Sequence, residues 1–333
     1  MRNQRLDVLR GLTMISMIAY HTLWDIHFIF GMPLGWYVGL PGYVWQQSIC
    51  WTFILLSGYL AGMGQYQDRQ GGQNDPGKEI NSRQRRKFPR RGLQVFGCGA
   101  LITVVTILVM PQDKVIFGVL TLLGSCKLIV WALHRFSGPH KKIPPISSPT
   151  SPIPLIYPES PYLGLAASFA AFTAFRHTEQ GWLGIPSDPR LWFAPSLPVS
   201  ARGLLIRLPE AFFCSNLTAY LGFPQPDFFS TDYFPLLPWF FLFMTGYFLY
   251  RCIAGKAAGP AGKRGNRIRQ AAGPPMERGN RIRLSADRER NAVQDTGLIG
   301  RILMKTGRHS LLIYMVHQPI IYGILLLVVR LFP

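Results

Sequence analysis

Seven long apolar runs constrain the fold of this chain more than any other feature of its sequence. Most of them reach the length of about 20 residues that a helix needs to cross the hydrocarbon core of a bilayer. We therefore expect an all-α, polytopic membrane protein with about seven transmembrane helices. The expected spans are Val8–Ile29, Trp45–Gly64, Leu93–Met110, Val115–Leu133, Tyr162–Phe175, Tyr233–Tyr250 and Ser310–Val329.

The distribution of charge supports a membrane protein over a nucleic-acid binder. Only 15% of the 333 residues are charged, against about 25% in a typical soluble domain, yet the net charge is +19. If the N-terminus is cytoplasmic, the inner segments hold 28 Lys and Arg with 9 Asp and Glu, whereas the outer segments hold 4 and 6. This is the positive-inside bias. It predicts a multi-pass protein of the inner (plasma) membrane with a cytoplasmic N-terminus, with the lipid bilayer as partner and no nucleic acid.

The hydrophilic segments indicate one membrane domain, residues 1–333, with flexible cytoplasmic insertions at 135–160 and 253–297. The first insertion is rich in Pro and Ser, and the second carries the basic sequence Arg264–Arg269 again at Arg278–Arg283. A topology signal or contact with anionic lipid explains these basic repeats better than a nucleic-acid arm. The long outer segment 177–232 is rich in Pro and aromatic residues, which favours a packed cap.

The first apolar run carries a row of ionisable residues on one helical face. At 100° per residue, Asp7, Arg10, His21 and Asp25 share this face, and Arg10 and His21 are roughly 16 Å apart along the axis. Ionisable groups within a membrane are costly and normally face a bundle interior or a wet cavity. Asp25 lies one turn after His21, so its carboxylate could accept the ring N–H and leave the other ring nitrogen as a general base. The alternative is a buried histidine that serves packing alone.

Four sequence blocks carry a family resemblance. Arg5-Leu-Asp7-Val-Leu-Arg10-Gly11, followed after ten residues by His21, resembles the opening of membrane acyltransferases of the heparan-alpha-glucosaminide N-acetyltransferase catalytic-domain family, and is similar to the signature of the wider acyltransferase-3 group. The other blocks are Phe53–Gly58, Ser230–Trp239 and Gly307–Pro319. Bacterial relatives often have a histidine where this chain has Thr121.

The resemblance implies transfer of an acyl group, with acetyl as the expected group, from acyl-CoA to a hydroxyl or amine of a sugar-like acceptor. Acetyl-CoA is then a co-substrate, no metal is needed, and a homo-oligomer is compatible with the sequence. Basic side chains at the inner mouth would hold the anionic head of CoA. The candidate catalytic residues are His21 and Asp25, and the candidates for CoA binding are Arg5, Asp7, Arg10, Arg308 and His309.

Four further residues are candidates for binding the acceptor: Asp232, Tyr233, His317 and Gln318. Asp232 could bind an amino or hydroxyl group at the outer mouth, or could instead cap the sixth span. His317 precedes Pro319, which is expected to kink the last span, so it could shape the acyl-CoA tunnel or form a structural bond between helices. His309 could bind a CoA phosphate or cap its helix.

Two other functions remain open on the sequence. One is a proton-coupled transporter that uses His21, Asp25 and His317 as a relay, and the other is a scaffold that docks partners through its basic 251–308 segment. The absence of an inverted repeat between the two halves speaks against the transporter. The sequence does not identify the acceptor or the acyl chain length, and it does not separate a covalent acyl-histidine from direct transfer.

Overall fold

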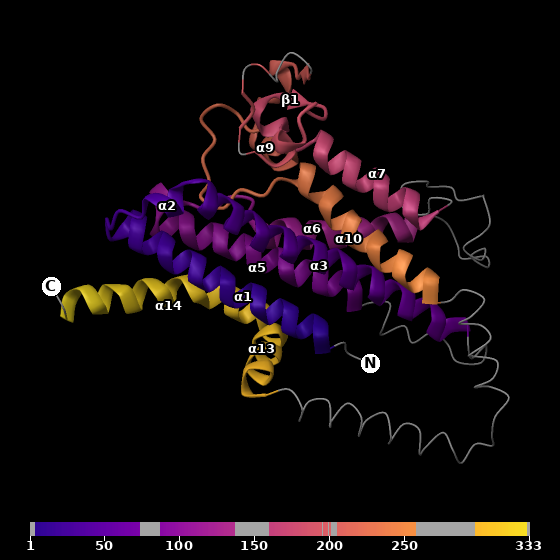
Figure 1. The fold of residues 1–333 in the computed structure, drawn as a ribbon, viewed down its shortest axis with the longest axis horizontal. Helices are drawn as coiled ribbons and strands as arrows, with labels where there is room; N and C mark the ends of the chain where they lie inside the picture. The colour runs from indigo at the N-terminus through magenta and orange to yellow at the C-terminus, as the bar shows by residue number, and fades with distance from the viewer. Residues whose placement is uncertain are drawn as a thin grey trace. The chain divides into compact units, whose positions relative to one another are not determined.

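A computed structural model describes residues 4–73, 87–136, 160–194, 196–198, 200, 205–257 and 297–331. The described chain is mostly helical, and each of the seven apolar runs forms a helix, as the sequence predicts (Figure 1). Almost all of both predicted insertions, including the repeated basic sequence, lies outside the described residues. The seven helices are α1 (Gln4–Trp24), α3 (Leu40–Gln73), α5 (Lys87–Val109), α6 (Val119–Phe136), α7 (Pro161–Ala174), α10 (Leu236–Ala257) and α14 (Ser310–Leu331).

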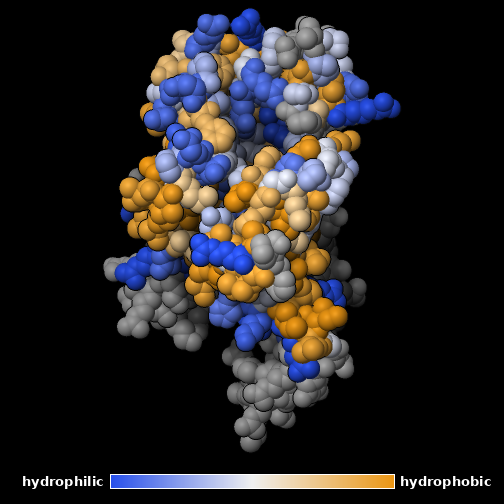
Figure 2. All heavy atoms as spheres, turned by 90° about the vertical axis from the view of Figure 1, so that its left-hand side faces the viewer, coloured by the Kyte–Doolittle hydropathy of each residue, from blue (hydrophilic) through white to orange (hydrophobic). Residues whose placement is uncertain are grey.

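Three of the described helices are both long and apolar enough to cross a membrane: α5 over Pro89–Val109, α10 over Leu236–Gly255 and α14 over Ser310–Leu331. Large apolar side chains are exposed along α5 and α14, including Leu108 at 77% and Leu327 at 58%. Broad hydrophobic areas of this kind are visible on the molecular surface in Figure 2. Such surfaces suit contact with lipid. The count of seven spans and the cytoplasmic N-terminus stay predictions.

The chain divides into two compact units, the first of which combines residues 1–53 with residues 253–333. Its helices are α1, the π-helical turn η1 (Asp25–Ile29), α2 (Gly35–Val38), the start of α3, α13 (Leu298–Arg308) and α14. Its core forms where Met14 and Met17 of α1 meet Ile49 of α3, with Ile313 and Tyr314 of α14 packed around them. The two ends of the chain therefore fold together.

The second unit, residues 54–252, is built on glycine-mediated helix contacts. A Cβ at Gly58 of α3 would clash with the Phe243 carbonyl of α10, and one at Gly246 would clash with the Leu55 carbonyl. Small residues allow membrane helices to approach at backbone distance. Phe172 of α7 and Phe243 of α10 are fully buried in this unit.

The described residues of the segment 177–232 are folded. Its elements are short: η3 (Thr178–Gln180), β1 (Trp182–Leu183), η4 (Pro189–Phe193), β2 (Ile206–Arg207), η5 (Glu210–Phe212) and α9 (Asn216–Leu221). The two strands are antiparallel and pair Trp182 with Arg207 and Leu183 with Ile206. Between η2 (Pro111–Asp113) and α6, the ring of Phe117 stacks on Phe228 and contacts Tyr220 of α9. These contacts confirm a packed segment, whereas its side of the membrane stays a prediction.

Candidate functional site

The first unit brings α13 against α1 at backbone distance. A Cβ at Gly11 of α1 would clash with the Leu303 carbonyl of α13, and one at Gly307 of α13 would clash with the Asp7 carbonyl of α1. Only glycine permits this approach at both positions. The sequence predicted no helix at α13, because its basic residues placed it in an inner loop. The i,i+4 spacing of the apolar residues Leu298 and Ile302, followed by Gly307, is the signal that could have revealed this helix.

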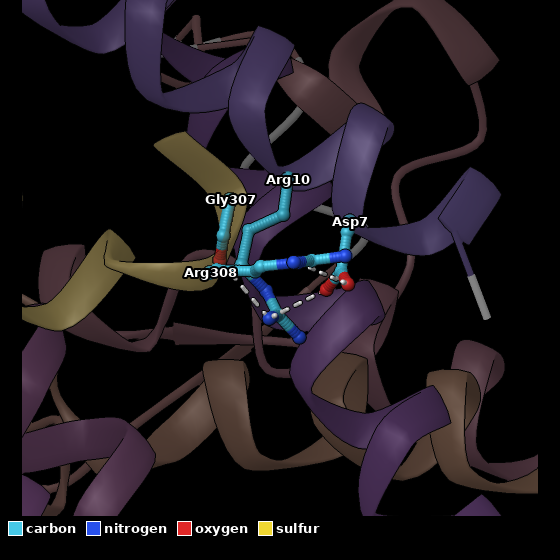
Figure 3. A network of polar contacts seen from close by, with 4 residues as sticks. All are labelled: Asp7, Arg10, Gly307 and Arg308. Carbon is cyan, nitrogen blue, oxygen red and sulfur yellow. Dashed lines mark hydrogen bonds and ion pairs between the residues drawn. The ribbon is translucent and has the colours of Figure 1, made fainter. Parts of the chain in front are cut away.

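This close crossing assembles a cluster of charges, shown in Figure 3. The buried carboxylate of Asp7 lies 3.5 Å from Arg10 Nη1 and 3.9 Å from Arg308 Nε. Arg10 Nη1 also donates a hydrogen bond of 3.3 Å to the Gly307 carbonyl. The structure thus unites three of the five residues predicted to bind CoA. Asp7 holds the two guanidinium groups side by side, and the three charges sum to +1.

The remaining predicted CoA-binding residues lie near the ends of the same helices. Arg5 is exposed at the start of α1. His309 follows α13 and lines an open hollow of about 360 Å³ together with Arg301, Met304, Lys305 and Arg308. Three basic side chains and a histidine around one hollow suit an anionic group such as a phosphate.

The predicted hydrogen bond between His21 and Asp25 is absent from the described structure. α1 ends at Trp24 and continues as the π-helical turn η1 from Asp25. A π turn closes i→i+5 hydrogen bonds, which changes the direction of the side chain at the start of the turn. The fully buried Asp25 carboxylate instead accepts a hydrogen bond of 2.6 Å from Gln318 Nε2 of α14.

His21 faces His317 of α14, with the two ring centroids 5.0 Å apart. His317 Nδ1 lies 2.8 Å from the Tyr314 carbonyl oxygen. A carbonyl can only accept, so Nδ1 carries a proton and Nε2 holds the lone pair of the neutral ring. His317 Nε2 is buried without a hydrogen-bond partner among the described residues. Two histidines from opposite ends of the sequence therefore lie in contact. α14 continues through Pro319 as one helix.

His21, Asp25, His317 and Gln318 form a histidine-carboxylate cluster. Three of its buried atoms lack a hydrogen-bond partner among the described residues: Asp25 Oδ2, Gln318 Oε1 and His317 Nε2. Each of them is an acceptor when Asp25 is ionised and His317 is neutral. Buried polar atoms without partners are uncommon in native structures and need an explanation. A bound group with N–H or O–H donors would satisfy them.

Asp232 and Tyr233 belong to the second unit and bind the protein itself. Asp232 Oδ2 accepts a hydrogen bond of 3.4 Å from the backbone N–H of Val119 at the start of α6. It thus caps α6, whereas the sequence raised a cap for the sixth span, α10. The Tyr233 hydroxyl donates to the Ala219 carbonyl of α9. These contacts hold the segment 230–234 against the start of α6.

Glu179 in the second unit is a titratable residue that sequence reasoning did not select. It follows α7 within η3, and burial raises the pKa of its carboxyl to about 7, although the nearby Arg176 opposes the shift. Arg176 itself lies over the ring of Trp239, 5.2 Å from the ring centroid. Only the isolated acid in an aromatic-rich segment could have drawn attention to Glu179.

The family comparison matches this chain over more than half of its length. The family described as "Heparan-alpha-glucosaminide N-acetyltransferase, catalytic" matches residues 2–143 and 187–274. The matched residues include Asp7, Arg10 and His21 of α1 and Asp25 of η1, and they end before α13 and α14. No curated protein and no solved structure matches the chain. On the strength of this match, the chain belongs to the heparan-alpha-glucosaminide N-acetyltransferase catalytic-domain family.

Proposed function

We propose that this protein transfers an acetyl group from acetyl-CoA to an amine or hydroxyl of a sugar-like acceptor, as a multi-pass enzyme of the inner membrane with a cytoplasmic N-terminus. Membership of an acetyltransferase family supports the class of reaction. The observation that carries the proposal is the histidine-carboxylate cluster formed by His21, Asp25, His317 and Gln318. Its two histidines can transfer a proton. Its three buried acceptor atoms, which have no hydrogen-bond partner among the described residues, favour a bound group with N–H or O–H donors.

The acceptor substrate carries hydrogen-bond donors at its reacting end. An amine or hydroxyl supplies N–H or O–H bonds to Asp25 Oδ2, Gln318 Oε1 and His317 Nε2, which have no partner among the described residues. A thioester carbonyl has no donor and would leave all three acceptors unsatisfied. The cluster therefore suits the acceptor better than the acyl group of the donor.

The imidazole pair provides the general base for the transfer. The acceptor nitrogen or oxygen attacks the thioester carbonyl and loses its proton to one of the two rings. A new C–N or C–O bond forms, the C–S bond breaks, and the imidazolium returns the proton to the CoA thiolate. His21 is the first candidate for the base, and His317 Nε2, with its lone pair directed away from Tyr314, is the second. A route through an acyl-histidine remains open.

The charge cluster of Asp7, Arg10 and Arg308 is the proposed site for the phosphates of CoA. Arginine pairs well with phosphate because its planar guanidinium presents several donors at once. Asp7 fixes the two arginines in one place before CoA arrives. His309, which lines the same hollow as Arg308, is added to this site, whereas Arg301 and Lys305 are not assigned to CoA. The pantetheine arm would then extend along α1 toward His21, about 16 Å deeper by helical rise.

A proton-coupled transporter is the alternative use of the same histidines. Membership of an acetyltransferase family weighs against it. The two functions separate in one assay: release of the CoA thiol from acetyl-CoA by detergent-purified protein, with glucosamine as acceptor. The transferase releases thiol only with both substrates present, and His21→Ala loses this activity. A transporter releases none.

A further inference from the structure

Helix α13 has three distinct faces, and only one of them packs on other described residues of the protein. The packed face holds Gly307 and Met304, which are buried, with Leu303 against Gly11 of α1. A second face is basic and exposed, with Arg301, Lys305 and Arg308. The third face lies almost opposite the packed one and is apolar. Leu298, Ile299 and Ile302 are exposed there by 68%, 75% and 50%.

We propose that α13 is an interfacial helix that binds a phospholipid leaflet containing anionic headgroups. Leu298, Ile299 and Ile302 enter the boundary between headgroups and acyl chains, while Arg301 and Lys305 bind headgroup phosphates. α13 would bind lipid in this way whether or not the chain transfers acetyl groups. Arg308, which the proposed function assigns to CoA, is not needed for it.

The orientation of α13 fits a helix that lies along a membrane surface. α14 has the length and hydropathy of a spanning helix. α13 ends at Arg308, and Figure 1 shows it leaving the start of α14 at a steep angle. A helix that meets the end of a spanning helix in this way runs along the plane of the bilayer. Its backbone contact with α1 fixes which face points outward.

The combination of apolar and basic faces identifies lipid as the occupant. An amphipathic helix with Lys and Arg beside large aliphatic residues is typical of membrane-surface helices. Each basic residue near an anionic surface adds to the attraction. A nucleic acid would use the basic face and leave three large apolar side chains in water. Lipid satisfies both faces at once.

The charge contribution is tested by lipid retention on the full-length protein. Protein is exchanged into micelles with equal amounts of phosphatidylglycerol and phosphatidylcholine, and bound lipid is counted by native mass spectrometry. R301Q/K305Q should retain several-fold less phosphatidylglycerol than the unmodified chain. The control R190Q/R207Q removes the same charge from two exposed residues of the second unit and should retain as much as the unmodified chain. Equal loss in both variants, or displacement of the lipid by glycerol 3-phosphate alone, would overturn the proposal.

Insertion of the apolar face is tested by fluorescence quenching. Ile299→Trp adds an indole on this face, and the protein is reconstituted into phosphatidylglycerol–phosphatidylcholine vesicles with and without brominated phosphatidylcholine. The added fluorescence should be quenched at least about twofold. The control Ile206→Trp places the indole at a residue that is similarly exposed, by 67%, in β2. Its added fluorescence should change little, and equal quenching of the two would contradict insertion.

Discussion

His21 and His317 lie face to edge with their ring centroids 5.0 Å apart, although 296 positions separate them in the sequence. α1 supplies one ring and α14 the other, and both helices belong to the unit that joins the two ends of the chain. The pair lies beside Asp25 of η1 and Gln318 of α14, which are joined by a hydrogen bond. The proposed proton transfer and the proposed binding of a donor group therefore involve the same four residues.

Replacing either histidine removes one ring of the proposed imidazole pair and shows which ring acts as the base. We expect His21→Ala to lower kcat for acetyl transfer by about 10²- to 10⁴-fold, the usual contribution of a general base. If His21 is the base, His317→Gln keeps a polar group and should cost less than His21→Ala. The rates are measured as acceptor-stimulated release of CoA thiol. A larger loss in His317→Gln would assign the base to His317 instead.

Asp25→Asn tests whether the buried carboxylate oxygen Asp25 Oδ2 binds the acceptor substrate. The substitution replaces one carboxylate oxygen by an NH2 donor, so the amine or hydroxyl of the acceptor loses a partner. We expect the KM for the acceptor to rise about 10-fold or more, which corresponds to the loss of one hydrogen bond to a charged group. The KM for acetyl-CoA should stay within about twofold. A change confined to the KM for acetyl-CoA would contradict this assignment.

Arg10→Gln and Arg308→Gln test the charge cluster. Each removes a guanidinium that the Asp7 carboxylate holds in place. We expect the KM for acetyl-CoA to rise by about 10-fold in each variant, with a smaller change in kcat, because phosphate contacts are remote from the reacting carbonyl. The control Arg207→Gln removes an exposed arginine that pairs with Glu210. An unchanged KM in both cluster variants would remove CoA from this site.

The crossing of α1 and α13 predicts opposite effects for two kinds of glycine. Gly11→Ala and Gly307→Ala place a methyl group into facing backbone, so both should lower the thermal midpoint and reduce CoA binding. Gly97→Ala in α5 meets no atom within 4 Å and should be neutral or stabilising by up to about 1 kcal/mol. Thermal unfolding in detergent compares the three variants. Equal effects at all three glycines would contradict the close crossing.

The pKa of Glu179 predicts a pH-dependent contribution to stability. In the folded protein its carboxyl has a pKa of about 7, above the usual 4.5, because burial disfavours the charge. The folded state therefore holds a proton that the unfolded state has lost between these values, and stability falls as pH rises from about 4.5 to 7. The loss is at most about 3 kcal/mol.

Glu179→Gln removes this dependence. The thermal midpoint of the variant minus that of the unmodified chain should be larger at pH 8 than at pH 5. Glu210→Gln, which replaces a side chain that is 91% exposed, should show the same difference at both pH values. A pH-independent effect of Glu179→Gln would contradict the raised pKa.

The sequence predicted the helices well because length and hydropathy are local properties. All seven apolar runs form helices, and the row of ionisable residues on α1 leads to the site. It missed α13, whose basic residues resembled a loop. It also missed the π turn at Asp25, which turns the carboxylate from His21 to Gln318. The capping of Val119 by Asp232 joins residues 113 positions apart, and no local pattern indicates such a pairing.

The most direct test of the account is acetyl transfer by the purified chain. Unmodified protein and His21→Ala are incubated with acetyl-CoA, with and without glucosamine, while CoA thiol and acetylated sugar are measured together. The account predicts equal amounts of both products from the unmodified chain, dependent on glucosamine, and neither from His21→Ala. No thiol release from a folded, unmodified chain that also fails to bind CoA by calorimetry would contradict it.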